Sequence, residues 1–237
     1  MYPSTDRGHE RCDESPVASE SDDLNVSGLR GRMRAARGSI SGPDRTLAEQ
    51  SVTERLLGLL DDNNGDRDAH DGRRIALYQP FDGEVSTKGM VEVLLAHGWS
   101  IWFPVIGPGA TMTFASWSEG QPFAHNRFGI AEPVTDDPPP GARPPFAEEL
   151  FARELDVIVV PCVALDGAGN RLGMGAGYYD RAFSSIDPIQ RANGRPWLIG
   201  VAFEAQLVDA LVPDEWDVPM DVVVTENRTI IHTPKCF

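Results

Sequence analysis

Lysine, cysteine and long apolar runs are all scarce in this sequence of 237 residues. Lys88 and Lys235 are the only lysines, so arginine must supply almost every positive charge that meets an anionic ligand. The net charge is -15, from 36 acidic and 21 basic residues, which argues against nucleic acid or an anionic membrane surface as a partner. No apolar run is long enough to cross a bilayer, so we expect no membrane-spanning segment.

The cysteines and histidines form no metal-binding or catalytic pattern. An odd number of cysteines, 3, without ligand spacing or a signal peptide, indicates a reducing compartment, and we expect a cytoplasmic protein. Cys162 follows an apolar run and is predicted to be a small core residue. The 5 histidines have no Asp or Cys partner at ligand spacing, and no G-x-S-x-G motif is present. We therefore expect neither a His/Cys metal site nor a catalytic triad.

The most informative stretch is residues 155–183, LDVIVVPCVALDGAGNRLGMGAGYYDRAF. Val157 to Val160 form a β-branched run, typical of a strand buried on both faces of a parallel sheet. The glycine-rich loop 171–177 follows, and residues 178–183 are predicted to be helical. Glycines let backbone N–H groups approach a phosphate, while Arg171 and a helix N-terminus add positive charge. The loop is neither a Walker A motif nor G-x-G-x-x-G, so a phosphate site and a purely geometric turn stay equally open.

The alternation of predicted strands and helices indicates an α/β sandwich with a mostly parallel sheet. We expect strands at 75–78, 99–106, 112–117, 157–160, 197–203 and 222–224, and helices at 29–37, 45–60, 84–97, 146–154, 178–183 and 204–211. Residues 27–237 are predicted to form a single domain. Residues 1–26 are acidic and polar and are predicted to be a disordered extension, and 136–145 a proline-rich loop or flap.

Charged residues outside this stretch suggest further parts of a site. Arg30, Arg34 and Arg37 recur at i, i+4 and i+7, which puts them on one helical face. That face is either solvated or turns one arginine, with Arg30 the candidate, toward a phosphate. Glu84 lies beyond the carboxyl end of a predicted strand, where ligands bind in open α/β sheets, or else caps the next helix. Asp180 in a first helical turn suits the helix dipole and is a possible Mg²⁺ ligand.

Together these segments resemble the 5-formyltetrahydrofolate cyclo-ligases, also called methenyltetrahydrofolate synthetases. The matching motifs run in order over residues 29–226: ALYQPFDGEVST, FGIAEP, PCVALD, RLGMGAGYYDR, GVAFEAQ and DVPMDVVVTE. The resemblance implies a NagB/RpiA/CoA-transferase-like three-layer α/β sandwich. It also implies conversion of a small-molecule substrate, 5-formyltetrahydrofolate, to 5,10-methenyltetrahydrofolate with ATP and Mg²⁺, releasing ADP and phosphate.

The resemblance also implies a role for each matching residue. Nucleotide binding falls on Arg30, Arg34, Arg171, Leu172, Gly173, Met174, Gly175, Ala176, Gly177, Tyr178 and Tyr179. Folate binding falls on Gln79, Glu84, Met174, Gly175, Ala176, Gly177 and Tyr178, and Mg²⁺ on Asp180 and Asp217. Arg171, Tyr178 and Asp180 are the catalytic candidates. In this chemistry the formyl oxygen attacks the γ-phosphate and N10 then closes the ring, which requires positioning and charge neutralisation rather than a nucleophilic side chain.

One position departs from the family pattern. Val26 stands where the family's N-terminal K-x-x-L-R motif has its lysine, so one cation at the nucleotide is missing. The sequence therefore leaves open an active cyclo-ligase or a catalytically weakened folate- or nucleotide-binding relative with a regulatory role. A sugar-phosphate isomerase of the same fold class is a third reading, for which no enolisation base is found. We expect a monomer or a weak homodimer.

Overall fold

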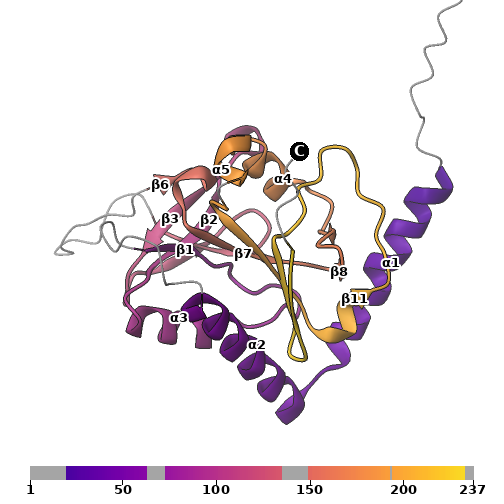
Figure 1. Ribbon diagram of the computed structural model, residues 1–237, viewed down its shortest axis with the longest axis horizontal. Coiled ribbons are helices and arrows are strands. Elements are labelled where there is room, and N and C mark those ends of the chain that lie inside the picture. Colours follow the sequence, from indigo (N-terminus) through magenta and orange to yellow (C-terminus); the bar gives the residue numbers. More distant parts are fainter. Residues whose placement is uncertain (1–19, 63–72, 135–148, 193, 233–237) are drawn as a thin grey trace, which may run out of the picture.

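A sheet of 8 strands runs through the middle of the molecule (Figure 1). Its strands, from edge to edge, are β13 (Thr229–Ile231), β12 (Val222–Val224), β10 (Trp197–Val201), β7 (Val157–Pro161), β1 (Arg74–Ala76), β2 (Ser100–Ile106), β3 (Met112–Trp117) and β6 (Glu149–Leu150). The five strands from β12 to β2 are parallel, and β13, β3 and β6 are antiparallel to their neighbours. The computed structural model describes residues 20–62, 73–134, 149–192 and 194–232, so the predicted flap at 136–145 lies outside the described residues.

Helices cover both faces of this sheet. The α-helices are α1 (Glu20–Ser39), α2 (Gly42–Asp62), α3 (Lys88–Ala96), α4 (Tyr178–Phe183) and α5 (Pro188–Ala192), and the 3-10 helices are η1 (Pro108–Ala110), η2 (Ala152–Glu154) and η3 (Glu204–Gln206). In Figure 1, α2 and α3 lie on one face of the sheet, α4 and α5 on the other, and α1 runs along the side beside β11. None of the described helices is both long and apolar enough to traverse a bilayer.

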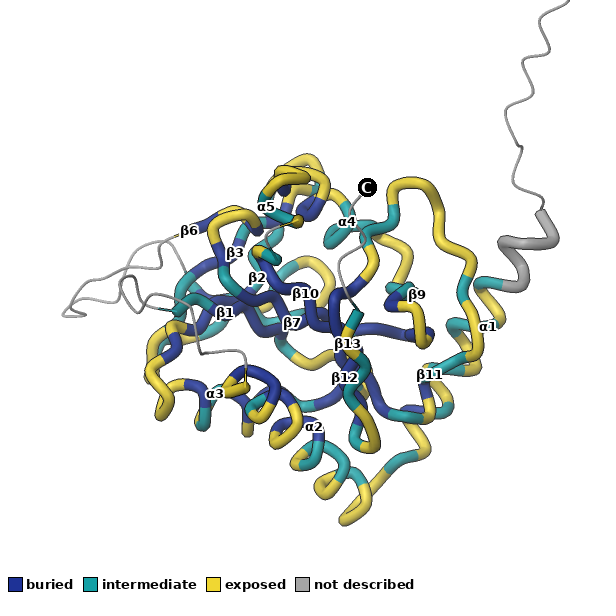
Figure 2. Tube along the Cα trace, viewed as in Figure 1, coloured by how far each residue is buried: buried dark blue, intermediate teal, exposed yellow. Residues whose placement is uncertain are grey.

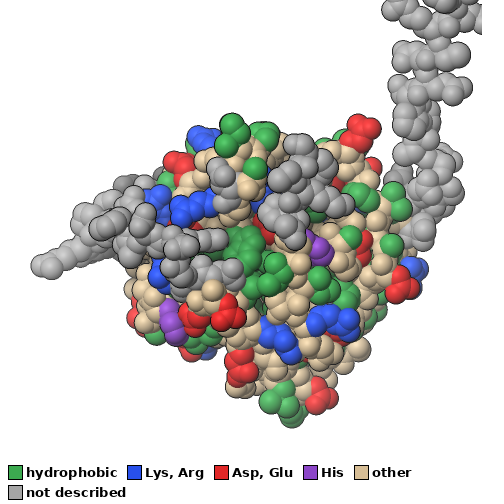
Figure 3. All heavy atoms as spheres, viewed as in Figure 1, with side chains coloured by type: hydrophobic (Ala, Val, Ile, Leu, Met, Phe, Trp, Pro, Cys, Tyr) green, Lys and Arg blue, Asp and Glu red, His purple; other side chains and the backbone are tan. Residues whose placement is uncertain are grey.

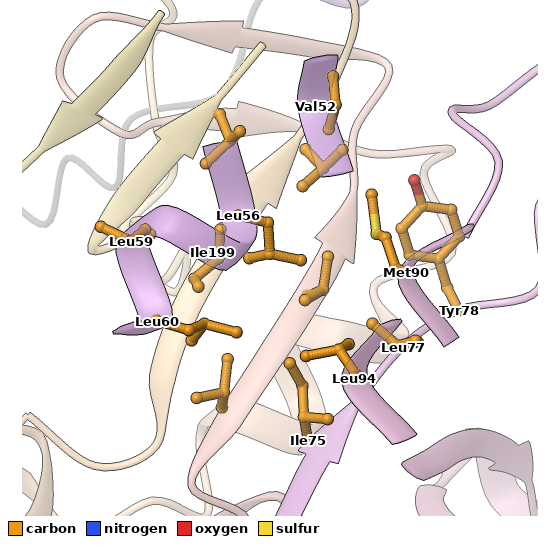
Figure 4. Packing of buried hydrophobic residues seen from close by; sticks show 14 of the residues in the cluster. Val52, Leu56, Leu59, Leu60, Ile75, Leu77, Tyr78, Met90, Leu94 and Ile199 are labelled. Carbon is orange, nitrogen blue, oxygen red and sulfur yellow. The ribbon is translucent and has the colours of Figure 1, made fainter. Parts of the chain in front are cut away.

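The central strand β7 explains why two helical layers are needed. Val157 and Val159 belong to the hydrophobic cluster under α2 and α3, whereas Ile158 and Val160 belong to the cluster under α4. Figure 4 shows the first cluster, and Figure 2 shows the buried strands between exposed helical surfaces. Because alternate residues of β7 are buried on opposite faces, the predicted two-sided strand and the three-layer α/β fold are confirmed. Each such aliphatic side chain stabilises the fold by about 1.5–3 kcal/mol on burial.

Two smaller sheets lie outside the central one. Strands β11 (Leu207–Val208), β8 (Ala164–Asp166) and β9 (Arg171–Leu172) form one, and β4 (Phe123–His125) pairs with β5 (Ala131–Pro133) in the other. On the face drawn in Figure 3, acidic and basic side chains are interspersed around an apolar patch. The β8–β9 hairpin matters most for function, because it delivers the glycine-rich loop to the carboxyl end of β7.

Several predicted elements differ from those observed. The described part of 146–154 is not an α-helix, because residues 149–150 pair with β3 and a 3-10 turn follows. The helix predicted at 204–211 is reduced to η3, since Leu207 enters the small sheet opposite Leu165. Helix α1 starts at Glu20, inside the segment predicted to be disordered, while residues 1–19 lie outside the described residues. At each of these positions, pairing with a distant strand or continuation of a helix overrides the local secondary-structure propensity.

The turn between β8 and β9 depends on Gly169. Its φ is 86°, and a Cβ there would lie 2.5 Å from the carbonyl oxygen of Met220. Asp166, which is buried, supports the turn by accepting hydrogen bonds from the amides of Ala168, Asn170 and Leu211. The turn therefore has both a conformational and a steric reason to keep glycine at this position.

Gly169→Ala is predicted to lower the free energy of unfolding by more than about 2 kcal/mol, through a strained φ and a clash with the backbone. Gly167→Ala is the matched control, because a Cβ there meets nothing within 4 Å and φ is not left-handed; we expect a change within about 0.5 kcal/mol. Urea unfolding of both variants measures the difference. Equal stabilities would show that the turn does not depend on Gly169.

Candidate active site

The residues proposed for the site come from separate elements that the fold brings to the carboxyl ends of β1 and β7. Gln79 and Glu84 follow β1, Arg30 and Arg34 lie on α1, Arg171 and Leu172 form β9, Gly173 to Gly177 form a loop, Tyr178, Tyr179 and Asp180 begin α4, and Asp217 precedes β12. This edge of a parallel sheet is where ligands bind in open α/β folds. The predicted location of the site is thus consistent with the topology.

The loop 173–177 has free backbone donors. Gly175 and Gly177 have φ of 94° and 64°, which bend the chain in the left-handed region between β9 and α4. Within the described residues, the N–H groups of 173–177 donate no hydrogen bond, and residues 174–176 are exposed. Consecutive free amides in such a turn form an anion-binding arrangement. The arrangement therefore supplies what a phosphate would need at this position.

Helix α1 contacts this loop through Arg30. The Nε of Arg30 donates to the carbonyl of Gly173 at 3.0 Å, and its guanidinium carbon lies 3.6 Å from where a Cβ of Gly175 would be. No carboxylate among the described residues pairs with Arg30, so its charge is available to an anion beside the loop. The helix thus places one cation next to the free amides.

Arg34 and Arg37, which share the face of α1 with Arg30, turn toward Asp82 instead. Arg34 Nε lies 2.5 Å from Asp82 Oδ2, and Arg37 donates to the same oxygen at 2.8 Å and to the Asp82 carbonyl at 2.9 Å. The hydrogen bond from Arg34 is the main reason that the pKa of Asp82 is lowered. Asp82 has a φ of 50°, an unusual conformation for a residue with a side chain. Arg34 therefore braces the turn before Glu84 rather than the glycine loop.

Glu84 is partly buried beyond β1. Its Oε2 accepts a hydrogen bond from the Phe81 amide at 3.1 Å, and its Oε1 lies 4.0 Å from the buried Arg37 Nη1, which has no hydrogen-bond partner among the described residues. Burial raises the pKa of Glu84 to about 7, against the opposing effects of the Phe81 amide and the Arg37 charge. Helix α3 starts only at Lys88, without a side-chain cap, so the alternative that Glu84 caps this helix is wrong.

Arg171 lies close enough to the carboxylates of Asp180 and Asp217 to interact with both. It donates to Asp180 Oδ1 and to the carbonyl of Val218, and its side chain is only 6% exposed. Burial raises the pKa of Asp217, and the charge of Asp180 raises it further, while Arg171 lowers it. The two carboxylates therefore repel each other, and Arg171 supplies the compensating charge. The described residues contain no cluster of three or more His, Cys, Asp or Glu side chains, so a Mg²⁺ ion here would draw its remaining ligands from water or from a substrate.

Sequence reasoning missed the residues that surround Tyr178. Arg127 Nη2 donates to the Tyr178 hydroxyl at 2.6 Å, the Arg181 guanidinium lies 5.1 Å from the ring centre, and Phe128 meets the ring edge-on at 6.0 Å. The available signal was the FGIAEP segment, which was matched as a motif although no role was attached to its first aromatic residue or to the arginine before it. The Arg181 contact lies within α4, whereas those of Arg127 and Phe128 arise because the turn of the β4–β5 hairpin lies against the start of α4.

Cys162, which is buried, and Tyr179, which is partly buried, pack against the apolar core near the site. Cys162 is buried, and burial raises the pKa of its thiol to about 12, so the predicted core role is confirmed. Burial likewise raises the pKa of Tyr179, whose ring packs against Phe183 at 5.7 Å between centres. Gln79 is half-buried, and its side chain makes no hydrogen bond within the described residues. Gln79 therefore has side-chain polar atoms that could bind a ligand.

Comparison with known proteins identifies the family. The model of the 5-formyltetrahydrofolate cyclo-ligase family matches residues 24–226. The cyclo-ligase of Haemophilus influenzae is 32% identical over 83% of this chain and 95% of its own, and that of Escherichia coli K12 is 33% identical over 65% and 78%. The solved 5,10-methenyltetrahydrofolate synthetase of Aquifex aeolicus is 28% identical, covers 87% of this chain and 92% of its own, and superposes with a TM-score of 0.68. That of Mycoplasma pneumoniae, at 20% identity and a TM-score of 0.63, shares the fold over 85% of this chain.

Glu84→Gln is predicted to change how stability depends on pH. The pKa of Glu84 is raised from 4.5 in the unfolded chain to about 7 in the folded protein, so the folded state holds the proton more tightly. The stability that this proton contributes is present in full below pH 4.5 and is lost as pH rises through about 7. Relative to Glu84→Gln, the unmodified protein should lose up to about 3 kcal/mol of stability between these limits. Urea unfolding across this pH range measures it, with Glu92→Gln, an exposed carboxylate on α3, as the control. Parallel curves for Glu84→Gln and the unmodified protein would contradict the assignment.

Proposed function

The chain belongs to the 5-formyltetrahydrofolate cyclo-ligase family, and we propose that its loop 173–177 and Glu84 hold the two substrates of that reaction at two points along the arginine face of helix α1. The protein is a ligase that converts 5-formyltetrahydrofolate to 5,10-methenyltetrahydrofolate, and ATP use follows from the family. The observation that carries the placement is the run 173–177, whose amides have no hydrogen-bond acceptor within the described residues and whose central residues 174–176 are exposed. Arg30 lies next to this run and forms no ion pair with a described carboxylate.

The nucleotide side is built from main chain and arginine. Amides 173–177 donate to phosphate oxygens, and Arg30 adds a charge-assisted hydrogen bond at the same place. Arg171 donates to Asp180 and to the carbonyl of Val218, so in this proposal it positions that carboxylate, while the sequence-based expectation of a direct phosphate contact stays a prediction. Arg34 contributes indirectly, because it fixes the turn at Asp82.

The folate side is built around Glu84. A carboxylate here accepts hydrogen bonds from the N–H groups on the edge of a pterin, and binding of those donors stabilises the ionised form that burial disfavours. Gln79 has free polar atoms on the same side, and Met174 to Tyr178 border both substrates. The reaction then depends on bringing the formyl oxygen and the γ-phosphate together, since no nucleophilic side chain is required.

Asp180 and Asp217 fit a role in holding Mg²⁺. Burial is the main cause of the raised pKa of Asp217, and the charge of Asp180 adds to it. A divalent cation would offset both effects, and hard carboxylate oxygens together with phosphates are ligands that Mg²⁺ prefers. The ion would neutralise charge on the phosphates as the terminal one is transferred. In its absence Arg171 provides the positive charge beside Asp180.

The binding-only alternative rests on Val26. This residue lies one turn before Arg30 on α1 and carries no charge, so the nucleotide side has one cation fewer than the family motif provides. Arg30 and the free amides are retained, and phosphoryl transfer tolerates loss of one charge-assisted contact better than loss of the loop. Turnover therefore remains the better supported function.

Formation of 5,10-methenyltetrahydrofolate, followed by its absorbance, is the direct test. Purified protein should produce it from 5-formyltetrahydrofolate only when both ATP and Mg²⁺ are present, with one ADP per product, and chelation of the metal should stop it. Folate binding without any product in the complete mixture would instead support the regulatory, binding-only relative.

Arg30→Gln and Glu84→Gln are predicted to affect opposite substrates. Arg30→Gln should raise KM for ATP roughly tenfold with little effect on folate, and Glu84→Gln should do the reverse, since each removes one charge-assisted contact. Steady-state kinetics with each substrate varied in turn separates them, and Arg32→Gln, an exposed arginine on the same helix, serves as control. If both variants raised the same KM, the two sides of the site would be assigned wrongly.

A further inference from the structure

Two arginines next to Tyr178 have no acidic partner among the described residues. Arg127 lies in the turn between β4 and β5, and Arg181 lies on α4, yet both guanidinium groups contact the same tyrosine. Seven other arginines of the described chain form ion pairs with carboxylates. In a protein with a net charge of -15, two adjacent cations left unpaired beside a substrate site point to an anionic ligand.

These guanidinium groups are already fixed in place. Arg181 donates from Nε to the Ala110 carbonyl at 3.1 Å and from Nη2 to the Ala176 carbonyl at 2.8 Å. Arg127 is held by the Tyr178 hydroxyl and lies 5.0 Å from the centre of the Phe128 ring. Both side chains are exposed, so their remaining N–H groups are accessible. A carboxylate that binds here meets donors whose rotamers need little further ordering.

Exposed apolar side chains lie near the arginine pair. Phe128 is 47% exposed and packs edge-on against Tyr178, and Met174, 48% exposed, is two residues from Ala176, whose carbonyl accepts from Arg181. A ligand that suits this surface has a flat apolar part next to a dianionic part. A triphosphate has no apolar part directly attached to its charges, and the amides of loop 173–177 with Arg30 already provide for it.

We propose that Arg127 and Arg181 bind the carboxylates of the glutamate moiety of the folate, while Phe128, Met174 and Tyr178 contact its p-aminobenzoyl ring. This proposal rests on the proposed function, because it takes 5-formyltetrahydrofolate as the substrate. It adds a specificity element at the outer end of the site, which selects folates that carry glutamate over the unconjugated pteroate.

The test compares 5-formyltetrahydrofolate with 5-formyltetrahydropteroate, which lacks the glutamate. Arg127→Gln and Arg181→Gln should each raise Kd and KM for the folate roughly tenfold, leave KM for ATP unchanged, and have no effect with the pteroate. The unmodified protein should bind the pteroate more weakly than the folate. Arg127→Lys should restore part of the affinity, because it keeps the charge. Arg55→Gln, an exposed arginine on α2, is the matched control.

Other outcomes overturn the proposal. Equal losses with folate and pteroate would mean that the arginines only position Tyr178, and an increase confined to KM for ATP would mean that they bind the nucleotide. Equal affinity of the unmodified protein for both folate compounds would show that the glutamate contributes nothing. Because Kd is measured without turnover, a protein that binds folate but forms no product would contradict the proposed function while leaving the glutamate site intact.

Discussion

The arginine face of helix α1 is the constraint on which the two halves of the site depend. Arg30 and Arg37 are seven residues apart, a rise of about 10 Å along a helix, and they contact the glycine loop and the Asp82 turn respectively. Among residues 26–39, Arg37 is the only one that is buried. The helix is therefore attached through its arginines more than through an apolar stripe, and it sets the spacing between the glycine loop and the Asp82 turn.

Arg37 also explains the balance at Glu84. A buried guanidinium must be paired, and Arg37 donates two hydrogen bonds to Asp82. These bonds help to hold Asp82 at its φ of 50°. The remaining Nη1 faces Glu84 without a hydrogen bond, a situation that costs about 1–3 kcal/mol for a buried donor. Burial favours the protonated form of Glu84 and Arg37 favours the ionised form, so a ligand that offers hydrogen-bond donors can tip the group toward ionisation.

The sequence predicted the elements with a strong local signal and missed those decided by distant partners. The run 157–160, the arginine spacing on α1 and the helix at 178–183 were recognised because each pattern is complete within one segment. Strand β13 and the end of the 204–211 segment depend on pairing with β12 and β8, which no short window contains. The same holds for side chains: the 48-residue separation of Arg34 and Asp82 hides their ion pair from any local pattern.

The glycine loop shows that geometric and chemical reasons for a residue can be separated. Gly175 and Gly177 have left-handed φ, so the turn alone accounts for them. Gly173 does not, and a Cβ at this position would meet nothing within 4 Å, so the folded chain by itself does not require glycine there. Close approach of a ligand to its amide is a reason that remains. Gly175 and Gly177 therefore shape the turn itself, whereas the interpretation of the loop as a phosphate site, on which Gly173 bears, stays a prediction.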